Sequence, residues 1–141
     1  MFTRDSISKR CEQESIARNY EYGYRQLSEI ALKALSPGIN DPGTAILSLR
    51  ALIDLFGFRA LHFPPSSFSI AGSPFLVHRN ELSFDILFEQ TIYPIWDYGK
   101  EDRMLRQEFS LLLSQLALVA NSDSANVLYK QVKKRIGEEK V

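Results

Sequence analysis

The sequence predicts a mainly α fold, an irregular bundle of about five helices with one short β-hairpin, in a single domain over residues 1–141. Along most of the chain, apolar residues recur at spacings of three and four, which is typical of amphipathic helices. One stretch instead alternates apolar residues with serines, which is typical of strands. No repeat or low-complexity linker divides the chain, which is long enough to bury one core.

The first clear helix ends at a proline–glycine corner. A residue that precedes proline is pushed out of the α conformation, so Pro37 should stop this helix at Ser36. Gly38 is expected to take a positive φ angle, as the exit from a helix often requires. The buried face of the helix is predicted to consist of Tyr24, Leu27, Ala31, Ala34 and Leu35.

A second helix should begin almost at once. Asp41 is a good N-cap residue and Pro42 then occupies the first helical position, where its missing N–H costs nothing. Asn40 is an alternative cap, and Gly57 is expected to end the helix. The predicted buried stripe is Ala45, Leu49, Leu52, Ile53 and Phe56.

The stretch between Arg59 and Arg79 lacks helical spacing and contains several prolines and glycines. Phe68 and Ile70 alternate with serines, and a turn sequence follows at 71–74. The pattern predicts a short hairpin. Because a lone hairpin is marginally stable in water, it is expected to lie against the helices.

Helical spacing returns after Asn80, a candidate N-cap, and Gly99 marks where it breaks. Pro94 lies inside this pattern. Proline cannot donate the backbone hydrogen bond of a continuous helix, so the helix should kink or end near Tyr93.

Two further helices complete the chain. The first starts at about Asp102 and is apolar nearly all round, which predicts a central, enclosed position. The last begins at Asn121 or Ser122, and Gly137 is expected just after its end. The predicted stripe of the central helix is Leu105, Phe109, Leu112, Leu116 and Val119, extended by Leu111, Leu113 and Leu118.

Composition excludes several classes of function. Seventeen basic and seventeen acidic residues give a formal net charge of zero, which argues against a nucleic acid as partner. Cys11 is the single cysteine, so no internal disulfide or cysteine-based zinc cluster can form. His62 and His78 lack the spacing of metal ligands, so neither a metal nor a cofactor is expected.

Membrane and targeting signals are weak in this chain. The N-terminus has no apolar stretch of the kind that a signal peptide needs. The most apolar run, residues 111–120, is about half the ~20 residues of a spanning helix. The chain as given is therefore expected to be soluble.

The corner at 36–44 is the richest candidate site. In the structural interpretation, Asp41 caps a helix while Ser36, Pro37, Gly38 and Pro42 shape a stiff turn. In the binding interpretation, the free N–H groups at a helix start hold an anion or a carbonyl. The candidate ligand-binding residues are then Arg25, Glu29, Asn40, Asp41 and Thr44.

Residues 23–45, GYRQLSEIALKALSPGINDPGTA, resemble the signature of a predicted membrane protein family, domain of unknown function 2254. Glu29 stands where the family pattern has Asp, and Asn19 where it has an acidic residue. The resemblance implies that the chain is the soluble C-terminal portion of a bacterial integral membrane protein of the inner membrane, either as a separate protein or as an excised part. It implies no particular activity.

Two functions follow as hypotheses. The first is a non-catalytic assembly or regulatory domain, which would contact the membrane-embedded part of the parent protein or a second copy of itself. The alternative is a small-molecule or anion-binding domain, enzymatic or not, with its pocket at the 36–44 corner. The sequence contains no recognisable catalytic constellation that would favour an enzyme.

Overall fold

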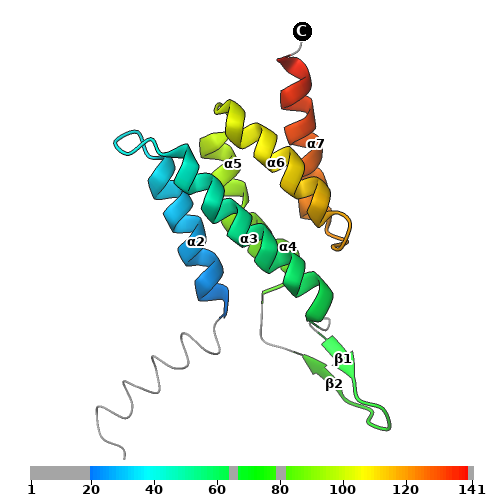
Figure 1. Ribbon diagram of the computed structural model, residues 1–141. Helices are drawn as coiled ribbons and strands as arrows, with labels where there is room; N and C mark the ends of the chain where they lie inside the picture. The colour runs from blue at the N-terminus through cyan, green and yellow to red at the C-terminus, as the bar shows by residue number, and fades with distance from the viewer. Residues whose placement is uncertain (1–19, 64–66, 79–81, 140–141) are drawn as a thin grey trace, which may run out of the picture.

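The computed structural model describes residues 20–63, 67–78 and 82–139, so Cys11, Asn19 and Asn80 lie outside it. The prediction of a mainly α fold is confirmed. Within the described residues the helices are α2 (Tyr20–Leu35), α3 (Pro42–His62), α4 (Phe84–Thr91), α5 (Tyr93–Gly99), α6 (Arg103–Leu116) and α7 (Asp123–Glu138), as Figure 1 shows.

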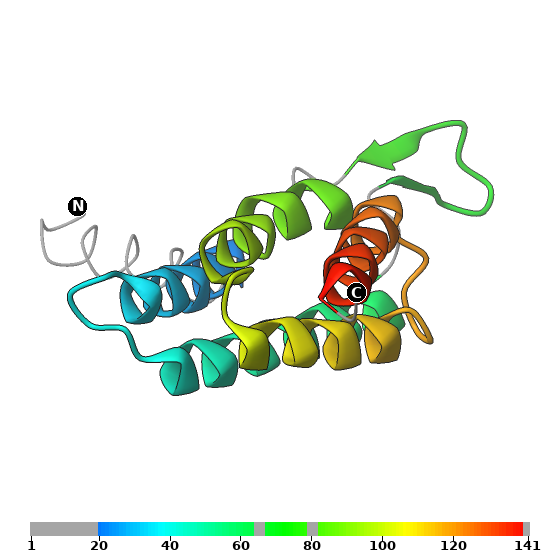
Figure 2. The ribbon, with the colours of Figure 1, turned by 90° about the horizontal axis from the view of Figure 1, so that it is seen from above.

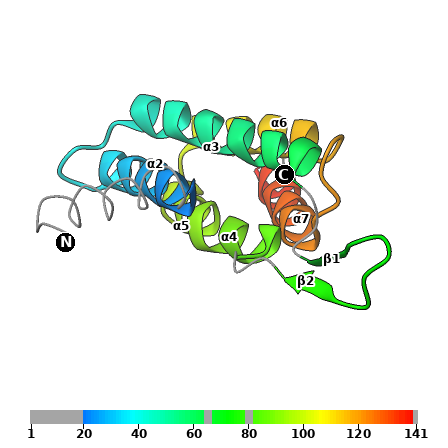
Figure 3. The same cartoon turned by 90° about the horizontal axis from the view of Figure 1, so that it is seen from below.

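The helices enclose the core from all sides. Figures 2 and 3 show α3 and α6 side by side on one face and α4 and α5 on the opposite face, with α2 and α7 between the two. Phe56 of α3 lies among aromatic rings of this core, since its centroid is 4.8 Å from Tyr24 and 5.2 Å from Phe88. All five residues of the predicted α3 stripe are buried: Ala45, Leu49, Leu52, Ile53 and Phe56.

The prediction that Gly57 ends the second helix is wrong, because α3 continues to His62. Glycine inside a helix costs about 1 kcal/mol relative to alanine, a penalty that tertiary contacts can offset. Here the last turns of α3 are held by Arg59, which is buried and donates a hydrogen bond to the carbonyl of Leu82. Gly57 itself lies beside Val119, whose Cγ2 would be 3.9 Å from an added Cβ.

The rod formed by α4 and α5 is interrupted at Ile92, so the break predicted near Tyr93 is confirmed. Pro94 explains the break, because it lacks the N–H that a continuous helix would use. Ser28 of α2, on the buried face of its helix, donates from Oγ to the carbonyl of Thr91 at 2.7 Å. This buried bond ties α2 to the interruption.

The predicted central position of the 102–120 helix is wrong. The helix α6 starts after its cap Asp102, ends at Leu116 and lies in an outer layer beside α3. Its buried face is contributed by residues such as Leu105 and Phe109, whereas Leu118 beyond its end is 85% exposed. The apolar residues of this segment continue past the end of α6 and cover more of its circumference than the buried face does. Some of them therefore face solvent.

The last helix starts where the sequence predicts and ends later. Ser122 is the N-cap of α7, and its side chain accepts a hydrogen bond from the N–H of Ala125. Gly137 lies inside α7, which runs to Glu138. The N-cap of α4 is Ser83, three residues after the candidate Asn80.

Between α3 and α4 lie two short strands, β1 (Ser67–Ser69) and β2 (Leu76–His78). They pair antiparallel, with Phe68 opposite Val77. The expectation that such a hairpin lies against the helices is wrong, because it projects from the helical body (Figures 1 and 3).

Two helical glycines should respond oppositely to alanine. At Gly99 an added Cβ would lie 3.1 Å from Leu105 Cδ1 and 3.4 Å from Leu35 Cδ1, so G99A overpacks the junction of α2, α5 and α6. We expect G99A to lower the free energy of unfolding by about 1–2 kcal/mol. At Gly57 an added Cβ would make only a van der Waals contact with Val119, so G57A should raise the free energy of unfolding by about 0.5–1 kcal/mol. Urea unfolding of both variants measures this, and shifts of the same sign would contradict the packing described.

Candidate functional site

The corner between α2 and α3 is closed by its own backbone. The N–H of Asp41 donates to the carbonyl of Ala34 at 2.7 Å, which brings the start of α3 against the last turn of α2. The N–H groups of Ile39 and Asn40 both donate to the carbonyl of Ser36, at 3.0 and 2.8 Å. The helix therefore stops at Leu35, and the corner is ordered by hydrogen bonds inside the loop.

Asn40, and not Gly38, takes the left-handed conformation that the corner needs. The φ angle of Asn40 is 47°, and Gly72 is the glycine with positive φ among the described residues. Asparagine tolerates this conformation better than other residues with a Cβ, since its short polar side chain can bond locally. The prediction for Gly38 is wrong, because the reversal occurs two residues later.

The predicted capping role of Asp41 is confirmed. Its Oδ1 accepts from the N–H of Thr44 at 3.1 Å and its Oδ2 accepts from the Thr44 hydroxyl at 2.5 Å, while Pro42 occupies the first turn. These bonds hold the pKa of the Asp41 carboxyl below its usual value, chiefly through the Thr44 hydroxyl and then through the backbone. Both oxygens of the carboxylate thus already accept hydrogen bonds from the first turn of α3.

The five candidate ligand-binding residues do not gather in one place. Asn40, Asp41 and Thr44 lie together at the corner. Arg25 lies about ten residues before the end of α2, which is about 15 Å along the helix, and its guanidinium donates to Gln90 Oε1 of α4 at 3.3 Å. Glu29 is exposed one turn further on.

A groove runs between α3 and α6 and begins beside the corner. Its cavity volume is about 430 Å³. Arg50 of α3 spans it and donates to the Glu108 carboxylate of α6 at 2.5 Å, a bond that raises the pKa of the Arg50 guanidinium. The residues that line this α3–α6 groove are Gly43, Ile46, Leu47, Arg50, Met104, Gln107 and Glu108.

Large apolar side chains stand exposed on the same two helices. They include Leu47 at 64%, Met104 at 63% and Leu111 at 52% exposure. Phe58 and Leu61 extend the set along α3, in the turns beyond Gly57. We call the surface formed by Leu47, Phe58, Leu61, Met104 and Leu111 the α3–α6 face. Sequence reasoning missed it because it placed Leu111 in the core and ended the helix before Phe58.

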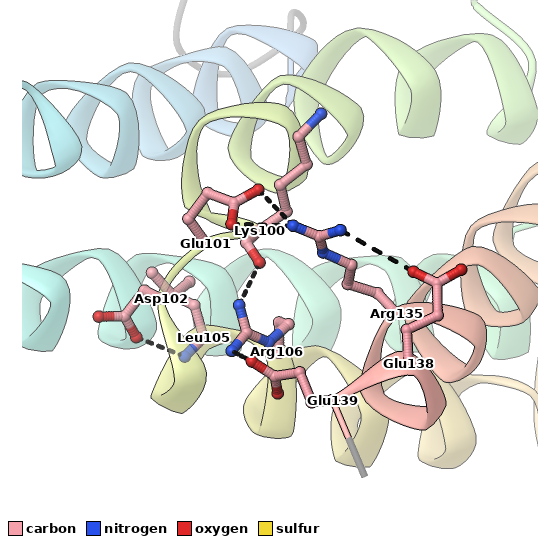
Figure 4. A network of polar contacts seen from close by, with 8 residues as sticks. All are labelled: Lys100, Glu101, Asp102, Leu105, Arg106, Arg135, Glu138 and Glu139. Carbon is pink, nitrogen blue, oxygen red and sulfur yellow. Dashed lines mark hydrogen bonds and ion pairs between the residues drawn. The ribbon is translucent and has the colours of Figure 1, made fainter. Parts of the chain in front are cut away.

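A second polar cluster joins the α5–α6 junction to the end of α7 (Figure 4). The buried guanidinium of Arg106 donates to the carbonyl of Lys100 at 2.6 Å and pairs with Glu139. Arg135 of α7 reaches both carboxylate oxygens of Glu101, at 2.7 and 2.9 Å. These bonds clamp three helices together and leave the charges paired within the fold.

The acidic residues of α4 likewise form hydrogen bonds within the fold, with the start of α7. Asp85 and Glu89 accept hydrogen bonds from the hydroxyls of Ser122 and Ser124 in the first turn of α7. Tyr93 donates to the carbonyl of Ser124 at 2.8 Å, and burial together with the two carboxylates raises the pKa of the Tyr93 phenol. Carboxylates near a helix N-terminus also interact favourably with its dipole.

Within residues 20–63, 67–78 and 82–139, no cluster of three or more His, Cys, Asp or Glu could hold a metal ion. His62 is exposed, stacks on Phe58 at 4.2 Å and contacts the Phe58 carbonyl through Nδ1 at 3.0 Å. The side chain of His78 lies outside the described residues. Of the aromatic residues that follow Pro94, Trp96 packs on Phe109, whereas Tyr98 is exposed.

The Asp41–Thr44 pair predicts a pH-dependent stability. The folded-state pKa of Asp41 lies below the ordinary value of 3.8 for an aspartate, so its charged form stabilises the folded state above that pH. We expect wild type to exceed D41N in free energy of unfolding at neutral pH, and the difference to shrink as the pH falls through the lowered pKa. T44V should raise the pKa of the Asp41 carboxyl in an NMR titration. An unchanged pKa in T44V would show that the hydroxyl does not hold the carboxylate.

The comparisons with known proteins agree with the resemblance at the corner. The model of the family described as predicted membrane protein (DUF2254) matches residues 8–115 of the chain. No curated protein and no solved structure matches it. Among the helices that the structure describes, none has the length and apolar character needed to cross a bilayer. Because the match covers most of the sequence, the chain belongs to the domain of unknown function 2254 family of predicted membrane proteins.

Proposed function

We propose that this chain is a non-catalytic assembly domain of a membrane protein, and that its α3–α6 face binds a second copy of the same chain. The observation that carries the proposal is the set of five exposed apolar side chains on two neighbouring helices, of which Leu47 and Met104 line the groove between the helices. Single exposed apolar residues are common, but a contiguous set rimmed by polar groups is typical of a protein interface.

The energy available from this face is sufficient for association. Leu47, Phe58 and Leu61 lie within about a third of a turn of one another on α3, so one flat partner can cover all of them. Full burial of a large apolar side chain contributes about 1.5–3 kcal/mol, and these half-exposed side chains would gain roughly half of that each. In a two-fold dimer both faces contribute, which exceeds the low end of the ~4–15 kcal/mol cost of association.

Charge favours a second copy as the occupant. The formal net charge is zero, so two copies do not repel each other at long range. The α3–α6 groove and its continuation carry both signs, Arg50 against Asp54 and Glu108, so a two-fold pairing can place opposite charges together. Copies confined to one membrane also meet at a high effective concentration.

The oligomeric state of the full chain tests this proposal. We expect a concentration-dependent dimer in light scattering after size exclusion. The double variant L47S/L111S should raise the dissociation constant about a hundredfold, since each residue contributes about tenfold or more. V127S, which alters a 48% exposed residue of α7, is the matched control and should leave the dimer intact.

A wild type that stays monomeric at high concentration would overturn self-association, and the membrane-embedded part of the parent protein would then be the occupant to test. Equal weakening by V127S would show that the α3–α6 face is not the interface.

The alternative function is a small-molecule or anion pocket at the 36–44 corner. It is supported by the α3–α6 groove, which begins at Gly43 next to that corner. It is disfavoured by Asp41, whose carboxylate bonds to Thr44 and places negative charge where an anion would bind. Arg25, a cation that could balance this charge, contacts Gln90 instead.

A thermal-shift titration with inorganic phosphate and with acetate decides between the two functions. The assembly proposal predicts no change in melting temperature in wild type or in N40A. A rise in wild type that N40A abolishes would establish the pocket and contradict a purely assembling role.

A further inference from the structure

The segment between β1 and β2 forms an arm that stands away from the helices. We call residues 67–78 the hairpin arm; its projection is plain in Figures 1 and 3. Three of its large apolar side chains are exposed, Ile70 at 53%, Phe75 at 74% and Leu76 at 56%. The arm is therefore an apolar element that the described part of the fold does not cover.

Its charge pattern differs from that of the rest of the chain. Residues 60–78 contain no Asp, Glu, Lys or Arg, whereas 24% of the whole sequence is charged. In the sequence this uncharged stretch is bounded by Arg59 and Arg79. The tip is a tight turn, in which Gly72 has a φ of 82° and the N–H of Ser73 donates to the Ile70 carbonyl at 3.0 Å.

The arm has little stability of its own in water. Its strands are three residues long and pair only with each other among the described residues. A two-stranded hairpin of this kind is marginal unless something covers its apolar side. The position of Phe75 and Leu76 next to the turn means that a covering surface would meet the tip first.

We propose that the hairpin arm inserts its tip into the lipid–water interface of the bilayer in which its family is placed. An uncharged apolar tip avoids the cost of moving a charge toward hydrocarbon, which is several kcal/mol at the bilayer centre. Among the described residues, the outer edges of the two strands pair with no further strand, and hydrocarbon does not tolerate unpaired backbone groups. The insertion is therefore shallow, at the depth of the headgroups and the first acyl carbons, as for amphipathic interfacial elements.

The same features separate the arm from the α3–α6 face. Charged residues of the kind found at the rims of protein interfaces lie beside that face, with Arg50 and Glu108 lining the α3–α6 groove and Asp54 lining a neighbouring pocket. The arm offers no charge with which a protein partner could fix orientation. Binding to a zwitterionic lipid surface requires no such charge.

Flotation of the full chain with phosphatidylcholine vesicles tests the proposal. We expect wild type to float with the vesicles and F75S/L76S to partition at least about a hundredfold more weakly, about tenfold per residue. The matched control is V127S, which removes an exposed apolar side chain of α7 outside both the arm and the α3–α6 face and should float like wild type. Because Phe75 and Leu76 are exposed, the melting temperature of the double variant should stay close to that of wild type.

A fluorescence readout places the tip in the lipid. Trp96 is the only tryptophan and is buried, so F75W adds a reporter at the tip of the arm. Addition of phosphatidylcholine vesicles should shift the emission of F75W to the blue and leave that of wild type unchanged. No flotation of wild type, or equal loss in V127S, would overturn the proposal. Loss of dimer without loss of flotation in F75S/L76S would show that the arm binds a second copy instead.

Discussion

The turn from α2 into α3 is closed by both the main chain and the side chain of Asp41. Its N–H bonds back to the carbonyl of Ala34, and its carboxylate holds the N–H and hydroxyl of Thr44. One residue thus ends one helix and starts the next, which lays α3 back along α2. Phe56 on α3 packs on Tyr24 of α2 and Phe88 of α4, so these core contacts require the chain to reverse at the corner.

Two sides of α3 contact other helices, and a third side is exposed. One side packs into the core and another lies beside α6, bridged by Arg50 and Glu108. The open side carries Leu47, Phe58 and Leu61, and it becomes a usable surface because α6 adds Met104 and Leu111 next to it. The proposed assembly through this face and the proposed lipid contact of the hairpin arm are compatible, since the two use different residues. Both proposals suit a chain that belongs to a family of predicted membrane proteins and whose described helices lack the length and apolar character needed to cross a bilayer.

Local chemistry explains which parts of this arrangement are predictable from sequence. The capping by Asp41, the stop before Pro37 and the break at Pro94 follow from short-range rules, and each is confirmed. Features that depend on tertiary packing are not predictable in this way. The continuation of α3 past Gly57 depends on the distant Leu82 carbonyl, and Asn40 replaces Gly38 at the reversal because the closing bonds decide where the chain turns. Periodicity also cannot tell a core residue from an exposed one, so Leu111 was predicted to be buried and Arg25 to lie near the corner.

Amide hydrogen exchange of the full chain tests most directly whether the corner is the constraint on which the fold depends. The corner is exposed, so an unbonded loop at this place would exchange rapidly. If Asp41 closes the turn, the amides of Asp41 and Thr44 should exchange as slowly as those in the middle of α2 and α3, and in the same cooperative event. Exchange of these two amides at the rate of a free peptide, while the two helices stay protected, would contradict the account.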